Sequence, residues 1–190
     1  MPNKKPPPIR HLRSVNDRLL AGAQPTPEEY VALADIGVTT VIDLRSGATN
    51  DPQSDDAAFL KTLGIEYVSL PLTDGHAPSL ELLDGVFAAI DRSLGRVYLH
   101  CAAGVGRTAS VEMAYRSRNG LEHGVLRQLT VGPPTIEQIW FVAGLREGRP
   151  SAVPCLVTIV SRALDAPRRA VGWLRAVATK TSSRNREVAR

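Results

Sequence analysis

One stretch of the sequence decides the fold, and it reads Val97-Tyr98-Leu99-His100-Cys101-Ala102-Ala103-Gly104-Val105-Gly106-Arg107-Thr108. An apolar run typical of a strand comes first, glycines follow, and a helical pattern begins at the threonine. A strand that turns through glycines into a helix points several backbone N–H groups at one spot, where the helix N-terminus adds positive potential. Such a cradle suits a phosphate group, and the guanidinium of Arg107 can bind two of its oxygens at once. The same field stabilises a thiolate, so Cys101 is expected to be a nucleophile at neutral pH.

The order of His, Cys, five residues, Arg and Thr resembles the signature loop of the protein tyrosine phosphatase superfamily, and the glycine spacing is most similar to its dual-specificity branch. The resemblance implies a two-step reaction in which a cysteine thiolate takes the phosphoryl group and water then hydrolyses the phosphocysteine. It implies Cys101 as the nucleophile and Arg107 as the phosphate clamp. Thr108 would hydrogen-bond the sulfur, and the ring of His100 would order the loop. The phosphate would be bound by the backbone amides of Ala102, Ala103, Gly104, Val105, Gly106 and Arg107.

Two other interpretations of the loop stay open. Cys101 can be a small buried residue at a tight turn, or the loop can bind phosphate without catalysis. The first does not explain why Arg107 enters the same turn. A P-loop NTPase is excluded as far as sequence allows, because the pattern GxxxxGK[ST] does not occur.

A leaving alkoxide or phenolate needs a proton from an acid outside the loop. The resemblance implies an aspartate on a loop that follows a strand upstream of the cysteine, and Asp74 is the matching position, after the strand-like run at 66–72. A turn or cap aspartate is the alternative, since Asp-Gly is a common turn pair. Asp84 and Asp91 also lie upstream but within a helical pattern, and His76 is a further potential proton donor or substrate contact.

The pattern of elements predicts an α/β fold with a central, mostly parallel sheet flanked by helices. In such sheets ligands bind beyond the carboxyl ends of the strands, where both Cys101 and Asp74 fall. The element order is similar to that of a small dual-specificity phosphatase over residues 10–148. The sequence predicts strand-like pieces within 9–21, strands at 38–44, 65–70 and 96–100, and helices at 27–36, 56–63, 79–94 and 108–119.

Two further residues are candidates for the site. Gln138 begins the last predicted helix of the catalytic region, where the resemblance implies a glutamine that helps to place the hydrolytic water. Arg45 follows the strand at 38–44 and matches an arginine that holds the signature loop or meets substrate. A plain helix residue and a structural ion pair with a carboxylate are the respective alternatives.

The chain has 190 residues, of which 43% are hydrophobic and 22% charged, as expected for one globular domain. We assign residues 1–8 to a disordered N-terminus and 9–148 to the catalytic domain. Cys101 must stay reduced, which favours the cytoplasm, and neither a signal peptide nor a run long enough to span a membrane is visible. Cys155 lies in an apolar stretch and is expected to be buried or half-buried, with a regulatory bridge to Cys101 as an alternative.

Residues 149–190 form a basic C-terminal extension, with nine Lys or Arg and two Asp or Glu, a net charge of +7, whereas the remainder has 14 and 17, a net charge of −3. In the first part of this extension, apolar residues recur at helical spacing: Val153, Leu156, Val157, Val160 and Leu164. A second helical piece is predicted at 167–179. The extension can pack on its own domain, form a dimer contact or lie peripherally on an anionic membrane surface.

The sequence thus indicates a hydrolase acting on phosphotyrosine, with phosphoserine and phosphothreonine as further substrates, in proteins. The alternatives are a phospholipid or other non-protein phosphomonoester phosphatase and a non-catalytic phosphate-binding module. No lysine stands between Cys101 and Arg107, which argues mildly against a polyphosphorylated substrate. No cofactor is expected, no metal is expected because His and Cys lack ligand spacing, and no nucleic acid is expected as partner.

Overall fold

The computed structural model describes residues 8–46, 53–124, 126–127, 129, 134–147 and 153–167, with 53–55 described by backbone alone. Its strands are β1 (Arg13–Ser14), β2 (Leu19–Gly22), β3 (Val38–Asp43), β4 (Glu66–Ser69) and β5 (Arg96–His100). Its helices are α1 (Pro27–Asp35), α2 (Gln53–Thr62), α3 (Leu80–Arg92), α4 (Gly106–Arg118) and α6 (Ile136–Arg146). A further helix covers 155–167 and is called the tail helix below.

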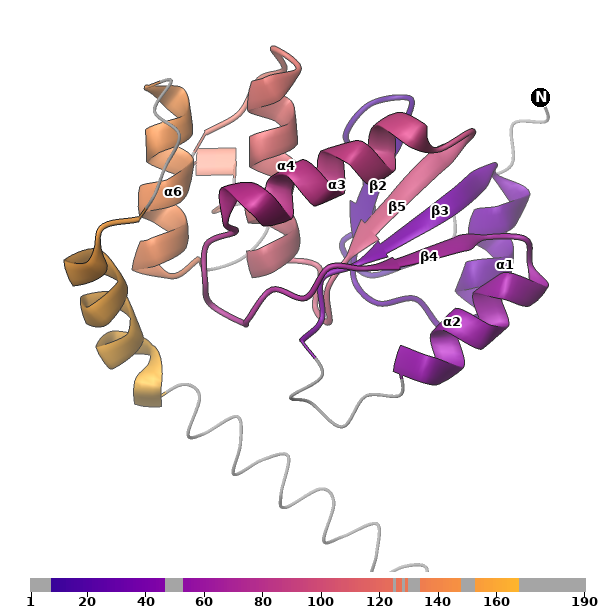
Figure 1. Ribbon diagram of the computed structural model, residues 1–190, viewed down its shortest axis with the longest axis horizontal. Helices are drawn as coiled ribbons and strands as arrows, with labels where there is room; N and C mark the ends of the chain where they lie inside the picture. The colour runs from indigo at the N-terminus through magenta and orange to yellow at the C-terminus, as the bar shows by residue number, and fades with distance from the viewer. Residues whose placement is uncertain are drawn as a thin grey trace, which may run out of the picture.

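The strands form one five-stranded sheet in the order β1-β2-β5-β3-β4. β1 pairs antiparallel with β2, and the other three pairings are parallel. The predicted α/β fold with a mostly parallel centre is therefore confirmed. Because β5 lies between β2 and β3, the loop after His100 opens at the middle of the carboxyl edge of the sheet (Figure 1).

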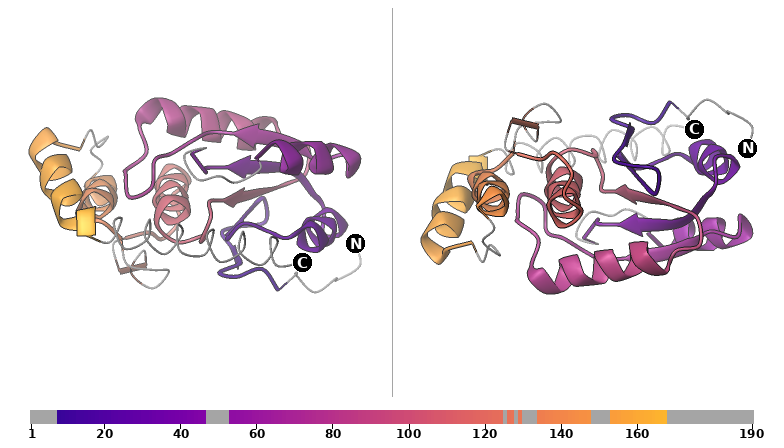
Figure 2. Two further views of the ribbon diagram at one scale, coloured as in Figure 1. Left: turned by 90° about the horizontal axis from the view of Figure 1, so that it is seen from below. Right: turned by 90° about the horizontal axis from the view of Figure 1, so that it is seen from above.

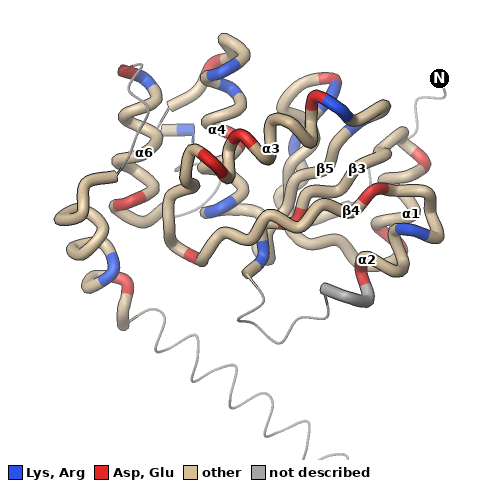
Figure 3. Tube along the Cα trace, in the orientation of Figure 1, with Lys and Arg blue, Asp and Glu red and all other residues tan. Residues whose placement is uncertain are grey.

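Helices cover both faces of the sheet, because successive residues of a strand point to opposite sides. On one face Leu19, Ile42 and Leu99 pack in a core cluster with side chains of α3, α4 and α6. On the other face Leu20, Val41 and Tyr98 pack with α1 and α2. Strand interiors are uncharged, and Figure 3 shows the charges mainly on the helices and near strand ends.

Side-chain caps set where three of the helices begin. Thr26, Ser79 and Thr135 each accept a hydrogen bond from a backbone N–H of the first turn, at α1, α3 and α6 respectively. The predicted elements recur with ends shifted by a few residues: α2 begins at Gln53 rather than at residue 56, and α4 begins at Gly106 rather than at Thr108. Termini of helices are the least determined part of such a prediction.

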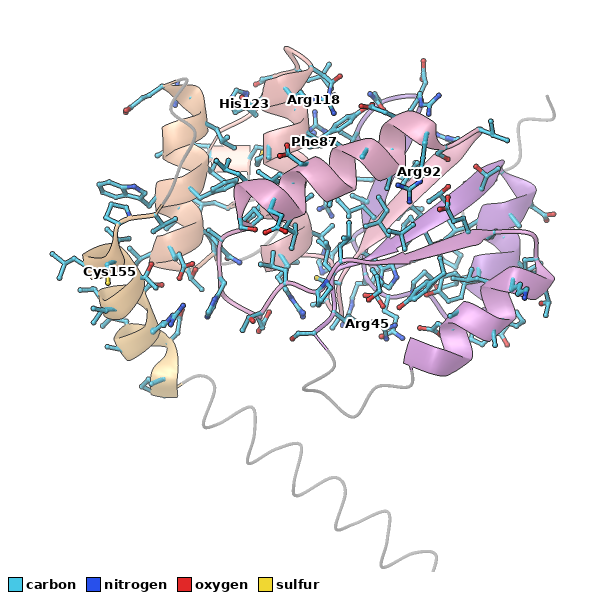
Figure 4. All side chains as sticks on the ribbon, viewed as in Figure 1. Arg45, Phe87, Arg92, Arg118, His123 and Cys155 are labelled. Carbon is cyan, nitrogen blue, oxygen red and sulfur yellow. The ribbon has the colours of Figure 1, made fainter. Side chains whose placement is uncertain are left out.

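The tail helix lies beside α6, on the side away from the sheet (Figure 2). Ser161 of the tail helix is buried and accepts a hydrogen bond from the backbone N–H of Glu137, in the first turn of α6, at 3.2 Å. The expectation that Cys155 is buried is wrong, because it stands on an exposed side of this helix (Figure 4). Both cysteines are free thiols, so Cys101 and Cys155 form no bridge in this structure.

The expected apolar repeat of the extension is only in part a packing face. Val153 packs against the main core, but Leu156, Val160 and Leu164 are exposed. The predicted helical piece at 167–179 falls almost entirely outside the described residues, as do residues 1–7 of the expected disordered N-terminus. The division into a catalytic domain and a C-terminal extension stays a prediction.

Candidate active site

The loop between β5 and α4 surrounds the sulfur of Cys101 with backbone. The side chain is buried, and the N–H of Gly104 donates a hydrogen bond to Sγ at 3.3 Å. Gly104 has a φ of +75°, the left-handed region that glycine enters without strain. Val105, which precedes the first turn of α4, provides no side-chain cap. The N–H groups at this helix end therefore remain available to an anion, whereas those of α1, α3 and α6 are partly satisfied by their caps.

Arg107 is held by the ends of two neighbouring strands. It is 8% exposed, and its Nη1 donates to the carbonyl oxygens of Leu44, at 3.4 Å, and Leu72, at 3.3 Å. Leu44 follows β3, and Leu72 lies in the segment after β4. These contacts fix the guanidinium beside the loop at the carboxyl edge of the sheet, where a phosphate clamp is needed.

Asp74 lies at the same edge. Its Oδ1 is 3.1 Å from Nε of Arg107. That Nε makes no hydrogen bond, so the contact is a close approach of opposite charges rather than an aligned bond. The Asp74 side chain is 82% exposed. The structure thus brings the predicted acid to the clamp while leaving its carboxyl group open to a bound substrate.

Three residues at the start of α6 hold the loop that carries Asp74. The hydroxyl of Thr135 donates to the carbonyl oxygen of Gly75 at 2.7 Å, and Nε2 of Gln138 donates to the carbonyl oxygen of His76 at 3.4 Å. The carboxylate of Glu137 accepts from the N–H of Ala77 at 3.0 Å. We call residues 73–79 the acid loop. Its backbone is attached to α6 at three successive residues.

Gln138 also lies against the signature loop. It is buried, and a Cβ placed on Gly106 would be 3.2 Å from its Nε2. Its Oε1 accepts from the N–H of Thr135 and completes a capping box at the start of α6. The amide therefore lies between the acid loop and the signature loop. Its predicted role in placing water stays a prediction.

His100 is buried beneath the loop and stacks on Tyr98, with ring centroids 5.7 Å apart. Its Nδ1 lies 3.1 Å from the carbonyl oxygen of Cys101, which makes Nδ1 the protonated nitrogen. Burial lowers the pKa of His100, although the carboxylate of Asp43, at 3.9 Å from Nδ1, opposes the shift. The ring is therefore neutral at neutral pH and positions the loop as a hydrogen-bond donor.

Arg45 is a buried partner of two carboxylates. Its guanidinium lies 2.7 Å from Asp43 Oδ2 and 2.6 Å from Asp56 Oδ2 (Figure 4 labels Arg45). The hydroxyl of Tyr67 donates to Asp43 at 2.7 Å. Burial by itself would raise the pKa of Asp43, but the bonds from Arg45 and Tyr67 and the nearby His100 hold it below its usual value. This geometry matches the ion-pair alternative for Arg45. Arg45 supports the signature loop from behind, because it pairs with Asp43, and Asp43 lies beside His100.

Thr108 shows no bond to the sulfur. Its Oγ1 is buried without a hydrogen-bond partner. The role implied by the resemblance, stabilising the sulfur as it leaves, therefore stays a prediction. Among the described residues, no group of three or more His, Cys, Asp or Glu side chains gathers in the way a metal site requires.

Sequence reasoning missed three residues that hold the site. Arg13 of β1 donates to the carbonyl oxygen of Gly104 at 3.0 Å and pairs with the buried carboxylate of Glu112. Glu112 also accepts from Arg116 at 2.9 Å, and Glu137 holds the acid loop as described above. A carboxylate inside the apolar pattern of α4 was the one available signal, because a buried acid needs a cationic partner.

Comparison with known proteins identifies the family. Residues 10–138, more than half of the chain, match the family described as "DSP-PTPase phosphatase fused to NAD+ Kinase". The chain belongs to this family. The family is of the dual-specificity type within the protein tyrosine phosphatase superfamily, as the signature loop predicted.

Relatives from both protein and lipid branches are similar to this family member. Dual specificity protein phosphatase 26 from Bos taurus is 27% identical over 106 residues, which are 55% of this chain and 50% of that protein. Phosphatidylglycerophosphate phosphatase PTPMT1 from Arabidopsis thaliana is 31% identical over 119 residues, 60% of this chain and 34% of that protein. The chain spans between about a third and a half of the length of these relatives.

Solved structures share the fold. A putative phosphatase (DUF442) from Shewanella putrefaciens CN-32 has a TM-score of 0.64 at 22% identity and covers 76% of this chain and 96% of its own. PTPMT1 in complex with PI(5)P has a TM-score of 0.60 at 18% identity and covers 72% of this chain and 95% of its own. At these identities the likeness concerns the fold, and it confirms the expected architecture. Within the described residues, no helix has the length and hydropathy needed to cross a bilayer.

Proposed function

We propose that this chain hydrolyses phosphomonoesters through a phosphocysteine intermediate. The observation that carries the proposal is the convergence of Cys101, Arg107 and Asp74 at one edge of the sheet, with a backbone N–H donating to the sulfur. A nucleophile, a clamp and an exposed acid at one point are the groups that phosphoryl transfer requires.

The reaction takes two steps. In the first, Sγ of Cys101 forms a bond to phosphorus, the bond from phosphorus to the leaving oxygen breaks, and Asp74 gives that oxygen a proton. In the second, a water oxygen attacks the phosphocysteine, Asp74 takes the proton from this water, and the sulfur leaves as thiolate. Arg107 and the N–H groups from Ala102 to Arg107 bind the equatorial oxygens in both steps, and Gln138 orients the water.

The substrate class proposed first is phosphotyrosine in proteins, with phosphoserine and phosphothreonine as further substrates. A relative of this class, dual specificity protein phosphatase 26, supports it. The second candidate is a phospholipid or other non-protein phosphomonoester. It is favoured by the 31% identity with a phosphatidylglycerophosphate phosphatase.

The nucleophile is tested with Cys101→Ser, and Cys155→Ser is its matched control because Cys155 is exposed on the tail helix. Hydrolysis of an aryl phosphate should fall about 10⁴-fold or more in the first variant and stay unchanged in the second. Binding of inorganic phosphate should persist in Cys101→Ser, because the clamp and backbone donors remain. Equal hydrolysis by wild type and Cys101→Ser would show that the loop only binds phosphate.

The acid is tested with Asp74→Asn on a series of aryl phosphates with leaving groups of different basicity. The rate should fall about 10²-fold or more for basic leaving groups and little for acidic ones, which depart without a proton. Asp84→Asn is the control, since Asp84 lies within α3. A uniform loss across the series would assign the proton to another group. Phosphopeptides and phospholipid monoesters assayed side by side then decide between the two substrate classes.

A further inference from the structure

The tail helix has an apolar face that no described residue covers. Leu156, Ile159, Val160 and Leu164 are 72%, 58%, 43% and 62% exposed. They stand at positions i, i+3, i+4 and i+8, which lie along one face of a helix. We call these four residues the outer stripe. Large side chains are rarely left in water in such a row without a binding role.

The rest of the helix explains why the outer stripe points away from the protein. Ser161 is 2% exposed and bonds to α6, and Val153, just before the helix, packs against the main core. The helix is thus fixed by its polar side. On the neighbouring α6, Ile136 and Trp140 stand one turn apart and are 40% and 46% exposed. Half-exposed tryptophans are common at a boundary between water and lipid.

Charge decides what covers the outer stripe. Residues 149–190 hold nine Lys or Arg against two Asp or Glu, whereas residues 1–148 hold 14 against 17. A second copy of the chain, docked through the same face, would bring two segments of net charge +7 together, because a two-fold interface pairs each patch with itself. An anionic bilayer attracts the extension and repels the acidic remainder, which also orients the molecule.

The stripe belongs to a helix that touches the active site. Nη2 of Arg162, on the tail helix, lies 3.4 Å from Nδ1 of His76 in the acid loop. Through Ser161 the same helix is bonded to Glu137, which holds the acid loop at Ala77. Figure 1 shows the tail helix next to the turn of the acid loop. The stripe is on another side of this helix from Arg162 and Ser161, so a surface that receives it leaves these contacts to the acid loop in place.

We propose that the outer stripe docks the protein on an anionic membrane surface, to which the net positive charge of residues 149–190 attracts it. The docked helix lies in the interface plane with Leu156, Ile159, Val160 and Leu164 below the headgroups. This inference goes beyond the proposed hydrolysis and does not depend on it, because no residue of the stripe belongs to the signature loop or the acid loop.

The test measures binding of the full chain to vesicles of phosphatidylcholine, with and without about one-third phosphatidylserine. Wild type should bind the anionic vesicles, and salt should release it because surface charges are screened. The double variant Leu156→Glu/Leu164→Glu should lower the partition coefficient about tenfold or more, since two apolar anchors become anions. The control is Leu94→Glu, a leucine that is 99% exposed just beyond α3 and outside the stripe, and it should bind as wild type does.

Hydrolysis of a soluble aryl phosphate is measured on the same samples and should be equal in wild type and both variants. That assay separates the two proposals, because loss of vesicle binding with full hydrolysis concerns the stripe alone. Equal partitioning of wild type and the double variant, or no preference for anionic vesicles, would overturn the docking surface. Sedimentation that shows a wild-type dimer and a monomeric double variant would overturn it too, by assigning the stripe to a second copy.

Discussion

Replacing Gly104 by alanine should damage catalysis far more than stability. Gly104 has a φ of +75°, and a Cβ on it would lie 2.5 Å from the carbonyl oxygen of Gly22 and closer still to two other backbone atoms there. Gly22 cannot retreat, because it is paired with His100 in the middle of the sheet. The signature loop must therefore move instead.

The size of the effect follows from these contacts. Ordinary contact between non-bonded heavy atoms begins near about 3.5 Å, so Gly104 has to shift by roughly 1 Å. The N–H that now lies 3.3 Å from the sulfur of Cys101 would then be out of bonding range. A misplacement of about 1 Å in a reacting group costs about 10²-fold in rate. The left-handed backbone adds a stability loss of about 1–2 kcal/mol for a residue with a Cβ.

The control is Gly120→Ala, after α4, where φ is +64° and no atom lies within 4 Å of the added Cβ. It carries the same backbone strain without the collision. Urea denaturation should give a loss of about 1–2 kcal/mol in Gly120→Ala, with kcat/KM for an aryl phosphate unchanged. Gly104→Ala should lose about 10²-fold in kcat/KM. The reasoning fails if both variants keep wild-type activity, since the loop would then tolerate displacement from the sulfur.

Three other substitutions probe the groups around the loop. Burial lowers the pKa of His100 in the folded state, so the unfolded chain takes up a proton first, and stability should fall as pH drops below 6.5, the ordinary pKa of histidine. In His100→Gln the fall in melting temperature between about pH 7 and pH 5.5 should be smaller. An identical fall would exclude His100 as its source. Arg45→Ala should cost about 3–5 kcal/mol of unfolding free energy by leaving the buried Asp43 carboxylate without its cation, and adding Asp43→Asn should restore part of it. If denaturation shows that the losses of the two single variants simply add in the double variant, the pairing is contradicted. Gln138→Ala should slow breakdown of the phosphocysteine more than its formation, seen as an unchanged burst followed by slower turnover in rapid-mixing experiments, whereas a reduced burst would place its role in the first step.

The local chemistry of the site could be predicted from the sequence because it is written in consecutive residues. The stretch from Val97 to Thr108 combines a strand, glycines and a helix start, and each part has a strong local preference. Asp74 was assigned from the resemblance, which implies an acid on a loop after a strand, and its place agrees with the rule that parallel strands end at one edge of the sheet. The structure brings it within 3.1 Å of Arg107.

The supporting residues could not be predicted because their partners are remote in the chain. Arg13 reaches a carbonyl 91 residues away, and Glu137 reaches an N–H 60 residues away. No local preference signals such a pair. Cys155 was misassigned for a related reason: its apolar neighbours indicated a packed apolar face, but the buried residue of this helix that bonds to α6 is Ser161. A periodic pattern predicts an amphipathic helix without stating which face the protein covers.

The attachment of the acid loop to α6 has a consequence for the entropy of phosphate binding. Bonds from Thr135, Glu137 and Gln138 to successive backbone groups of residues 75–77 order this segment during folding. Substrate therefore does not have to immobilise it, and the conformational entropy of that step is absent from the binding equilibrium. The affinity for inorganic phosphate should then have a small entropic penalty, because the anion meets a receptor that is already rigid.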